Sequence, residues 1–147
     1  MDAPDFGKPT LVNRRAVTIE WGDCDPAGIV FYPRYFAMFD ASTAALFQAA
    51  LGMPKIQWTR KFGMLGIPMV DTRAKFQIPS AYGDEVTIET RVTAFRRSSF
   101  DVEHRLLKAD GALGVEGFET RVWTARDAEG RIRSAPIPPE VVAAFAV

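Results

Sequence analysis

A chain of 147 residues is long enough for one domain with a full hydrophobic core, because a domain of this size buries roughly 68–70% of its unfolded surface. Its 18 basic and 18 acidic side chains cancel, so the overall charge gives no sign of a nucleic-acid or anionic-membrane partner. A single cysteine excludes a disulfide framework, and neither a membrane-spanning apolar run nor a signal-peptide pattern is present. The composition therefore predicts a soluble, cytoplasmic domain.

The N-terminal part of the chain changes character at about residue 13. Residues 1–12 contain prolines and a glycine and show no hydrophobic period, which predicts a mobile tail ahead of a single domain at 13–147. From Arg14 to Trp21 the side chains alternate as in a half-buried strand, with one face made of Arg15, Val17, Ile19 and Trp21.

A polar turn and a long helix follow. In the stretch Trp21 to Asp40, WGDCDPAGIVFYPRYFAMFD, Pro26 and Gly28 exclude both a regular helix and an uninterrupted central strand. Pro33 suits a first helical turn, and apolar side chains then recur at helical spacing as far as Ala50. Gly52 and Pro54 end this predicted helix. Residues 55–62 fit either a short second helix or a loop.

After Gly66 the hydrophobic period changes to two, which is typical of strands. Four strands are expected: Val70 to Ile78 with one buried face, Val86 to Ala94, Phe100 to Leu106, and a last long strand around Phe118 that bends at Gly117. Predicted turns separate them at 79–83, 96–99, 110–111 and 127–130, and Pro138 begins a short terminal helix. This order predicts an α+β fold in which one helix and one antiparallel sheet bury each other's apolar faces.

Chemistry is expected where the polar turn meets the helix. Asp23 and Asp25 lie in that turn, at which unpaired helix N–H groups and the positive end of the helix dipole point. A plain connection with solvated aspartates is the alternative. Cys24 is a rival nucleophile, but its two flanking aspartates disfavour the thiolate that it would need, so a small packed residue is predicted.

His104 is the one histidine, so any triad must use it. Its place on the apolar face of a strand favours a satisfied core or subunit-contact residue. One histidine and one cysteine leave little for a zinc site, and no phosphate-binding glycine loop is present. The sequence therefore predicts neither a metal nor a resident cofactor.

The polar turn resembles the active-site segment of the hotdog-fold acyl-CoA thioesterases, in particular the Asp-dependent 4-hydroxybenzoyl-CoA thioesterase family. The resemblance is carried by Gly22 to Val30 and by Tyr32, Pro33 and Tyr35, and it continues from about Arg15 to Pro139. It implies a hotdog fold, in which the antiparallel sheet wraps around one long central helix. It also implies a homodimer whose sheets join edge to edge with active sites between the subunits, and a dimer of dimers (a homotetramer).

The resemblance also assigns roles to residues. The aspartate before proline, Asp25, is the expected catalytic group, acting as a nucleophile or as a general base. The Tyr32 N–H would stabilise the oxyanion, while its ring lines the acyl pocket or staples the helix start. Gly28 would let the substrate approach the backbone, and Phe31 stands where a relative has an indole.

A basic turn is the expected coenzyme A site. Arg96 and Arg97 match a family turn that grips the phosphates of coenzyme A, although Ser98 replaces a third basic residue. A solvated turn is the alternative. Coenzyme A enters as part of the substrate, and no other cofactor is expected.

The sequence therefore predicts an acyl-CoA thioesterase acting on an aromatic acyl group such as 4-hydroxybenzoyl, without a nucleic-acid or membrane partner. A thioesterase for short aliphatic acyl-CoA or for acyl carrier protein is the nearest alternative. A hydratase would have to use His104, which its strand position disfavours. A non-catalytic acyl-CoA-binding hotdog protein would keep Arg96 and Arg97 but would not need Asp25.

Overall fold

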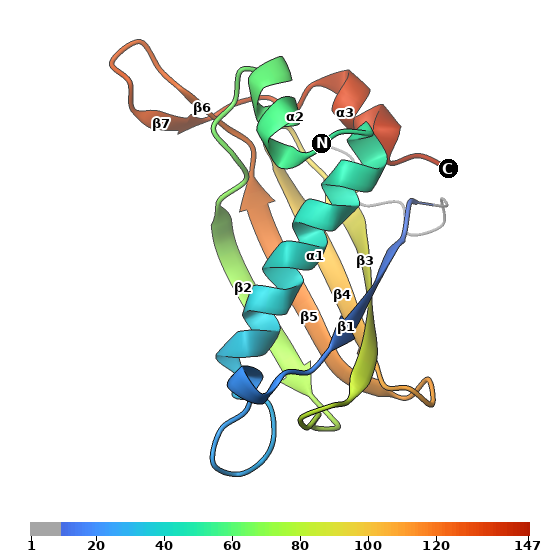
Figure 1. Ribbon diagram of the computed structural model, residues 1–147. Coiled ribbons are helices and arrows are strands. Elements are labelled where there is room, and N and C mark those ends of the chain that lie inside the picture. Colours follow the sequence, from blue (N-terminus) through green and yellow to red (C-terminus); the bar gives the residue numbers. More distant parts are fainter. Residues whose placement is uncertain (1–9) are drawn as a thin grey trace.

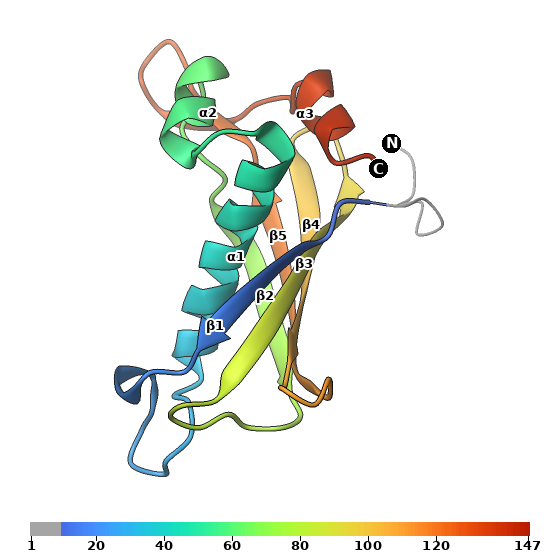
Figure 2. The ribbon, with the colours of Figure 1, turned by 45° about the vertical axis from the view of Figure 1, so that its right-hand side comes forward.

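One long helix lies in the concave face of a twisted antiparallel sheet (Figures 1 and 2). The computed structural model describes residues 10–147. Five strands form the sheet in the order β1 (Asn13–Thr18), β3 (Glu85–Phe95), β4 (Ser99–Leu107), β5 (Leu113–Val122) and β2 (Met69–Phe76). A small hairpin, β6 (Thr124–Arg126) and β7 (Ile132–Ser134), extends from the end of β5. The expected α+β arrangement of one helix on one antiparallel sheet is confirmed.

The central helix is α1 (Pro33–Leu51), close to its predicted bounds. Pro33 occupies the first turn, where its missing N–H costs nothing. Gly52 ends the helix in the left-handed conformation at φ 69°, and its N–H bonds to Gln48 O at 2.9 Å. Residues 55–62, left open by the sequence, form the short helix α2 (Lys55–Lys61), and α3 (Pro139–Ala144) is the predicted terminal helix.

The interior consists of two hydrophobic clusters with a polar layer between them. The lower cluster packs the first half of α1 on the sheet and includes Ile19, Val30, Tyr35, Met38, Phe39, Val86, Ile88, Leu106 and Val115. The upper cluster joins the end of α1 to α2 and α3 through Leu46, Phe47, Trp58, Phe100, Trp123 and Phe145. The polar layer contains buried Ser42 and Thr43 of α1 and Thr90, His104, Glu119 and Arg121 of the sheet.

Gly117, at which the sequence predicts a bend, lies within a regularly paired part of β5. It pairs with His104 on one side and Ala74 on the other, without a shift of register at that point. A Cβ on Gly117 would fall 2.6 Å from Cε2 of Phe39. The glycine therefore lets α1 approach the sheet closely at Phe39.

Two expectations from the hydrophobic pattern are wrong. The first strand ends at Thr18, and Trp21, expected to continue one face of it, is 77% exposed in a 3₁₀ turn, η1 (Trp21–Asp23). Strand β2 has no buried face: Val70 is 63% and Phe76 52% exposed. β2 lies at an edge of the sheet, and α1 covers it only in part: Phe76 packs against Tyr35 and Phe36 of α1 and still remains half exposed.

The termini of the described chain meet beside α3. Of the predicted tail, residues 1–9 lie outside the described range, whereas the Leu11 N–H donates to Phe145 O at 2.9 Å. In residues 10–147 no single helix is long and apolar enough to span a membrane; α1 and α2 together pass by length and composition, but with a 60° bend between them.

Candidate active site

The loop between β1 and α1 folds back on itself and carries Asp25 to the entrance of the helix (Figure 1). The Phe31 N–H donates to Asp23 O at 2.8 Å, and the Asp25 N–H donates to Ile29 O at 3.0 Å. Gly28 makes the turn at φ 84°, in the left-handed region, and its N–H bonds to Asp25 O at 2.9 Å. The predicted residues Asp25, Gly28, Phe31 and Tyr32 are therefore brought together in one loop.

This loop presents a carboxylate, which is a hydrogen-bond acceptor, and a backbone N–H donor, and neither is fully used. The half-buried carboxylate of Asp25 accepts the Ala27 N–H through Oδ1 at 2.8 Å, which fixes the side chain, and Oδ2 has no partner within residues 10–147. The Tyr32 N–H, at the N-cap of α1, has no acceptor in the same range. A carboxylate can attack an electrophilic carbonyl carbon. An unpaired N–H at the positive end of a helix can stabilise the oxyanion that then forms.

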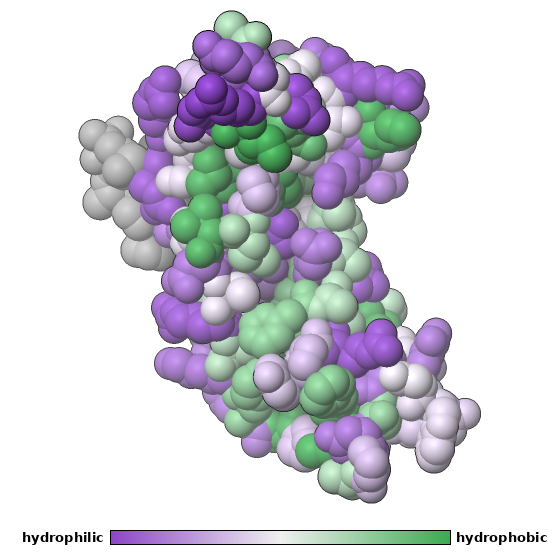
Figure 3. Space-filling model, turned by 90° about the vertical axis from the view of Figure 1, so that its left-hand side faces the viewer, coloured by the Kyte–Doolittle hydropathy of each residue, from purple (hydrophilic) through white to green (hydrophobic). Residues whose placement is uncertain are grey.

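An apolar pocket of about 290 Å³ adjoins the loop. Its walls come from the loop, the first turn of α1, the end of β2 and β5, through Ile29, Val30, Tyr32, Tyr35, Phe76, Gln77, Ile78, Pro79 and Val115. Phe76 lies 6.3 Å from Tyr32 and 5.8 Å from Tyr35, measured between ring centroids. Figure 3 shows the hydrophobic surface that gathers on this side of the molecule.

Sequence reasoning missed most of this pocket. It named Tyr32, but assigned Phe76 and Ile78 to a buried strand face, where the structure leaves them 52% and 40% exposed. Phe31, predicted to shape the pocket, is 48% exposed and packs edge-on against Tyr32 with ring centroids 5.7 Å apart. The available signal was the pair of large apolar residues Phe76 and Ile78 just before Pro79, close to the polar turn in space but not in sequence.

Asp23 and Cys24, the two residues before Asp25, each make contacts that stabilise the loop. Asp23 caps the turn, accepting the Glu20 N–H at 2.9 Å through Oδ2, and its backbone closes the loop. Cys24 is half-buried and packs against the lower hydrophobic cluster. The predictions of a turn-stabilising aspartate and a packed cysteine agree with these contacts.

The basic turn lies at the opposite end of α1 from Asp25. Arg96, Arg97 and Ser98 join β3 to β4, whereas Asp25 precedes a helix of 19 residues, about 28 Å long. Arg96 forms a two-pronged ion pair with Asp101, with N–O distances of 2.9 and 2.5 Å, and this bond lowers the pKa of Asp101. Arg97 is exposed and has no ion pair within the described chain. One chain therefore does not bring the basic turn and Asp25 together.

His104 is a satisfied core residue, as predicted. It is fully buried and stacks on Phe39 at 4.6 Å; its Nδ1 lies 2.8 Å from Thr90 Oγ1 and its Nε2 3.0 Å from Glu119 Oε2. Its position in the polar layer, away from the Asp25 loop, gives it no contact with that loop.

Glu119 and Arg121 extend the layer toward solvent, and sequence reasoning missed both. Glu119 Oε1 accepts from Arg121 Nε at 2.7 Å, and Arg121 Nη2 reaches Asp40 at 2.8 Å. Burial raises the pKa of Glu119, but the hydrogen bonds from His104 and Arg121 outweigh it and lower the pKa to about 2. Glu119 is therefore a buried carboxylate that stays charged at neutral pH.

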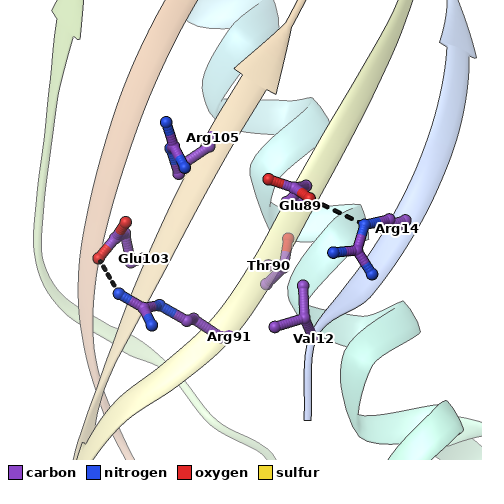
Figure 4. A pocket seen from close by; sticks show the side chains of 7 residues that line it. All are labelled: Val12, Arg14, Glu89, Thr90, Arg91, Glu103 and Arg105. Carbon is purple, nitrogen blue, oxygen red and sulfur yellow. Dashed lines mark hydrogen bonds and ion pairs between the residues drawn. The ribbon is translucent and has the colours of Figure 1, made fainter. Parts of the chain in front are cut away.

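The outer face of the sheet has a second hollow, of about 180 Å³, across β1, β3 and β4 (Figure 4). Arg14 pairs with Glu89 at 2.8 Å and Arg91 with Glu103 at 3.2 Å across its walls. These two pairs neutralise each other, and Arg105 adds one positive charge to a polar depression on the face of the sheet opposite α1. Among residues 10–147, no group of three or more acidic, histidine or cysteine side chains is placed to hold a metal ion.

The family model described as "Thioesterase-like superfamily" matches residues 19–145 of the chain. The chain belongs to the thioesterase-like superfamily. It is 35% identical over 128 residues to the 4-hydroxybenzoyl-CoA thioesterase of Pseudomonas sp. (strain CBS-3), which covers 84% of this chain and 90% of that protein. It is also 34% identical over 89 residues, 60% of this chain and 64% of that protein, to a 1,4-dihydroxy-2-naphthoyl-CoA hydrolase of Synechococcus elongatus.

Solved structures of thioesterases share the fold over nearly the whole chain. A 4-hydroxybenzoyl CoA thioesterase mutant complexed with 4-hydroxybenzoyl CoA aligns with a TM-score of 0.83 and 33% identity, over 92% of this chain and 99% of that one. A gentisyl-coenzyme A thioesterase aligns with a TM-score of 0.78 and 30% identity, over 91% and 100%. The expected hotdog fold and the family resemblance are confirmed.

Proposed function

We infer that this protein is a thioester hydrolase that cleaves acyl-CoA, and we propose that its acyl group is aromatic, with 4-hydroxybenzoyl as the leading candidate. The observation that carries the proposal is the junction of three features at one end of α1. These are the Asp25 carboxylate, the unpaired Tyr32 N–H and the aromatic-lined pocket beside them. The curated relatives and the gentisyl-coenzyme A thioesterase are each named for an aromatic acyl-CoA, which supports the same substrate class.

The chemistry follows from what each group supplies. Asp25 would attack the thioester carbonyl to form a mixed anhydride, or would remove a proton from an attacking water. The Tyr32 N–H and the positive end of α1 would stabilise the oxyanion that forms in either route. A thiolate leaves readily, so neither route needs a strong general acid. A relative bound 4-hydroxybenzoyl CoA as an aspartate-to-asparagine mutant, which supports a carboxylate in this role.

The pocket favours a flat, apolar acyl group. Its volume of about 290 Å³ and its three aromatic side chains, Tyr32, Tyr35 and Phe76, suit a ring that packs edge-on or offset against them. Gly28 would let the substrate pass close to the backbone, and Phe31 packs edge-on against Tyr32 from outside the pocket wall. A short aliphatic chain would leave much of this aromatic surface without contact.

We further propose that the enzyme is a homodimer joined through the β2 edge. β2 exposes Val70 and Phe76, and an unpaired edge with apolar side chains is a template for pairing with another strand. The separation of Asp25 from the basic turn points the same way, because a second copy can bring its own turn to the first copy's pocket. A dimer of dimers is the larger assembly that we expect.

In such a dimer Arg97 is the main phosphate contact that we propose. Its side chain is exposed, whereas the guanidinium of Arg96 is held by Asp101 and Ser99, so Arg96 would stiffen the turn. Ser98 would add a hydrogen bond. Coenzyme A arrives as part of the substrate, and we propose no other cofactor and a cytoplasmic location.

Hydrolysis of a panel of acyl-CoA thioesters by the wild-type protein tests the function. We expect free coenzyme A to be released fastest from single-ring aromatic thioesters, and more slowly from naphthoyl, short aliphatic and acyl-carrier-protein substrates. A preference for aliphatic or carrier-protein thioesters would overturn the proposed acyl class. Tight binding of all acyl-CoA without release would instead identify a non-catalytic binding protein.

A further inference from the structure

Tyr35 combines an aromatic ring in the acyl pocket with a hydroxyl whose hydrogen-bonding capacity is only half used. It lies one turn beyond Tyr32 along α1 and is 4% exposed. Its ring forms part of the pocket wall and packs against Phe76 at 5.8 Å between centroids. The hydroxyl is the one group that distinguishes this side chain from a phenylalanine at the same place in the wall.

The hydroxyl has one partner in the described chain. Its oxygen accepts the Ser80 N–H at 3.2 Å, which leaves its own proton without an acceptor among residues 10–147. A buried O–H without an acceptor costs free energy, and its donor strength increases when its oxygen already accepts a bond. The hydroxyl is therefore prepared to donate to an additional acceptor.

Its place in the pocket follows from the neighbours of Ser80. Ser80 directly succeeds Pro79, and its carbonyl accepts the Val30 N–H at 2.9 Å; Pro79 and Val30 both line the pocket. The hydroxyl of Tyr35 thus lies where the wall from the loop meets the wall from the β2–β3 connection. Ser80 Oγ is already occupied, since it accepts from Lys108 Nζ at 2.8 Å, and Gln77 is the other polar side chain of the pocket wall besides the two tyrosines.

We propose that Tyr35 is a specificity-determining residue, whose O–H donates to an oxygen substituent on the acyl ring, remote from the thioester. This rests on the proposed function, which places the thioester carbonyl at the Tyr32 N–H and the ring deeper in the pocket. The substrate class is then a hydroxylated aryl-CoA rather than any aromatic acyl-CoA. An unsubstituted ring leaves the Tyr35 proton unpaired in a dry pocket, which weakens its binding in the transition state.

The test compares 4-hydroxybenzoyl-CoA with benzoyl-CoA, for the wild type and for Tyr35→Phe. We expect the wild type to favour the hydroxylated substrate in kcat/KM by about tenfold, the scale of one net hydrogen bond, and Tyr35→Phe to lose most of that ratio. Benzoyl-CoA is the internal reference, because a purely structural loss at the Ser80 turn would reduce both activities equally. Tyr82→Phe, which removes an exposed hydroxyl outside the pocket, should keep the wild-type ratio.

A ratio that stays at its wild-type value in Tyr35→Phe would overturn the proposal while leaving the thioesterase function intact. Wild-type protein that cleaves neither substrate would instead reject the proposed function on which it rests. Should Tyr35→Phe fail to fold, inhibition of the wild-type enzyme by the two free acids tests the proposal instead. 4-Hydroxybenzoate should inhibit about tenfold more strongly than benzoate, and equal inhibition would overturn the proposal.

Discussion

Replacing Glu119 with glutamine should destabilise the protein strongly, because it removes the charge on which the buried polar layer depends. Glu119 is 4% exposed and accepts hydrogen bonds from Thr43, His104 and Arg121. Glutamine keeps the shape but leaves the buried guanidinium of Arg121 with Asp40 as its remaining anionic partner. Loss of one partner of a buried ion pair costs about 3–5 kcal/mol of the free energy of unfolding.

The pH dependence provides a second estimate of the same quantity. A pKa of about 2 in the folded protein, below the ordinary 4.5, means that Glu119 contributes stability that is fully present above pH 4.5. This contribution is lost as the pH falls from 4.5 toward 2. Each unit of pKa shift corresponds to about 1.4 kcal/mol, so the charged form contributes about 3 kcal/mol at neutral pH.

Urea unfolding followed by tryptophan fluorescence measures both effects, with the protein concentration held constant because association adds stability. Glu103→Gln is the matched control, since its pair with Arg91 is partly exposed and is expected to contribute less than about 1 kcal/mol. The stability gap between wild type and Glu119→Gln should narrow from pH 7 to pH 3. Equal stability of the two variants at pH 7, or a gap unchanged at pH 3, would refute the reasoning.

Three further outcomes are expected. Gly117→Ala places a Cβ 2.6 Å from Phe39 and should lower the free energy of unfolding by about 1–3 kcal/mol, whereas Gly22→Ala, with open space around it, should cost much less; equal losses in urea unfolding would contradict this. Arg97→Ala should raise KM for acyl-CoA severalfold with kcat nearly unchanged, and the effect should vanish with an acyl-pantetheine that lacks the nucleotide; an unchanged KM would reject the phosphate contact. Val70→Lys should produce monomers in sedimentation at micromolar concentration, and an unaltered dimer would exclude the β2 edge as the joining surface.

The helix and the central strands could be predicted because their burial follows a simple period. In β3 and β4 every second side chain is buried. α1 begins at Pro33, which fits the first helical position, and is ended by Gly52, which adopts the left-handed conformation. The same rule failed for β2. Alternation shows that a strand has an apolar face, but what covers that face depends on its place in the sheet, and an edge strand reached only in part by α1 leaves Phe76 exposed.

The site was predictable where its groups are adjacent in sequence. The loop motif places Asp25 and Tyr32 within eight residues, and short-range hydrogen bonds bring them together. Long-range contacts were not accessible in this way. The binding of Arg96 by Asp101 requires the register of the β3–β4 turn, and the layer around Glu119 requires the pairing of β4 with β5.

The turnover of 4-hydroxybenzoyl-CoA by Asp25→Asn tests the central claim most directly. Asparagine keeps the Ala27 contact within reach but is neither a nucleophile nor an effective base, so kcat should fall by about 10²–10⁴, or further if Asp25 attacks directly. Binding of the substrate should persist, because the Tyr32 N–H and the pocket are unchanged. Asp23→Asn is the control two residues away, and it should retain appreciable turnover. Near wild-type hydrolysis by Asp25→Asn would contradict the assignment of the active site to this loop.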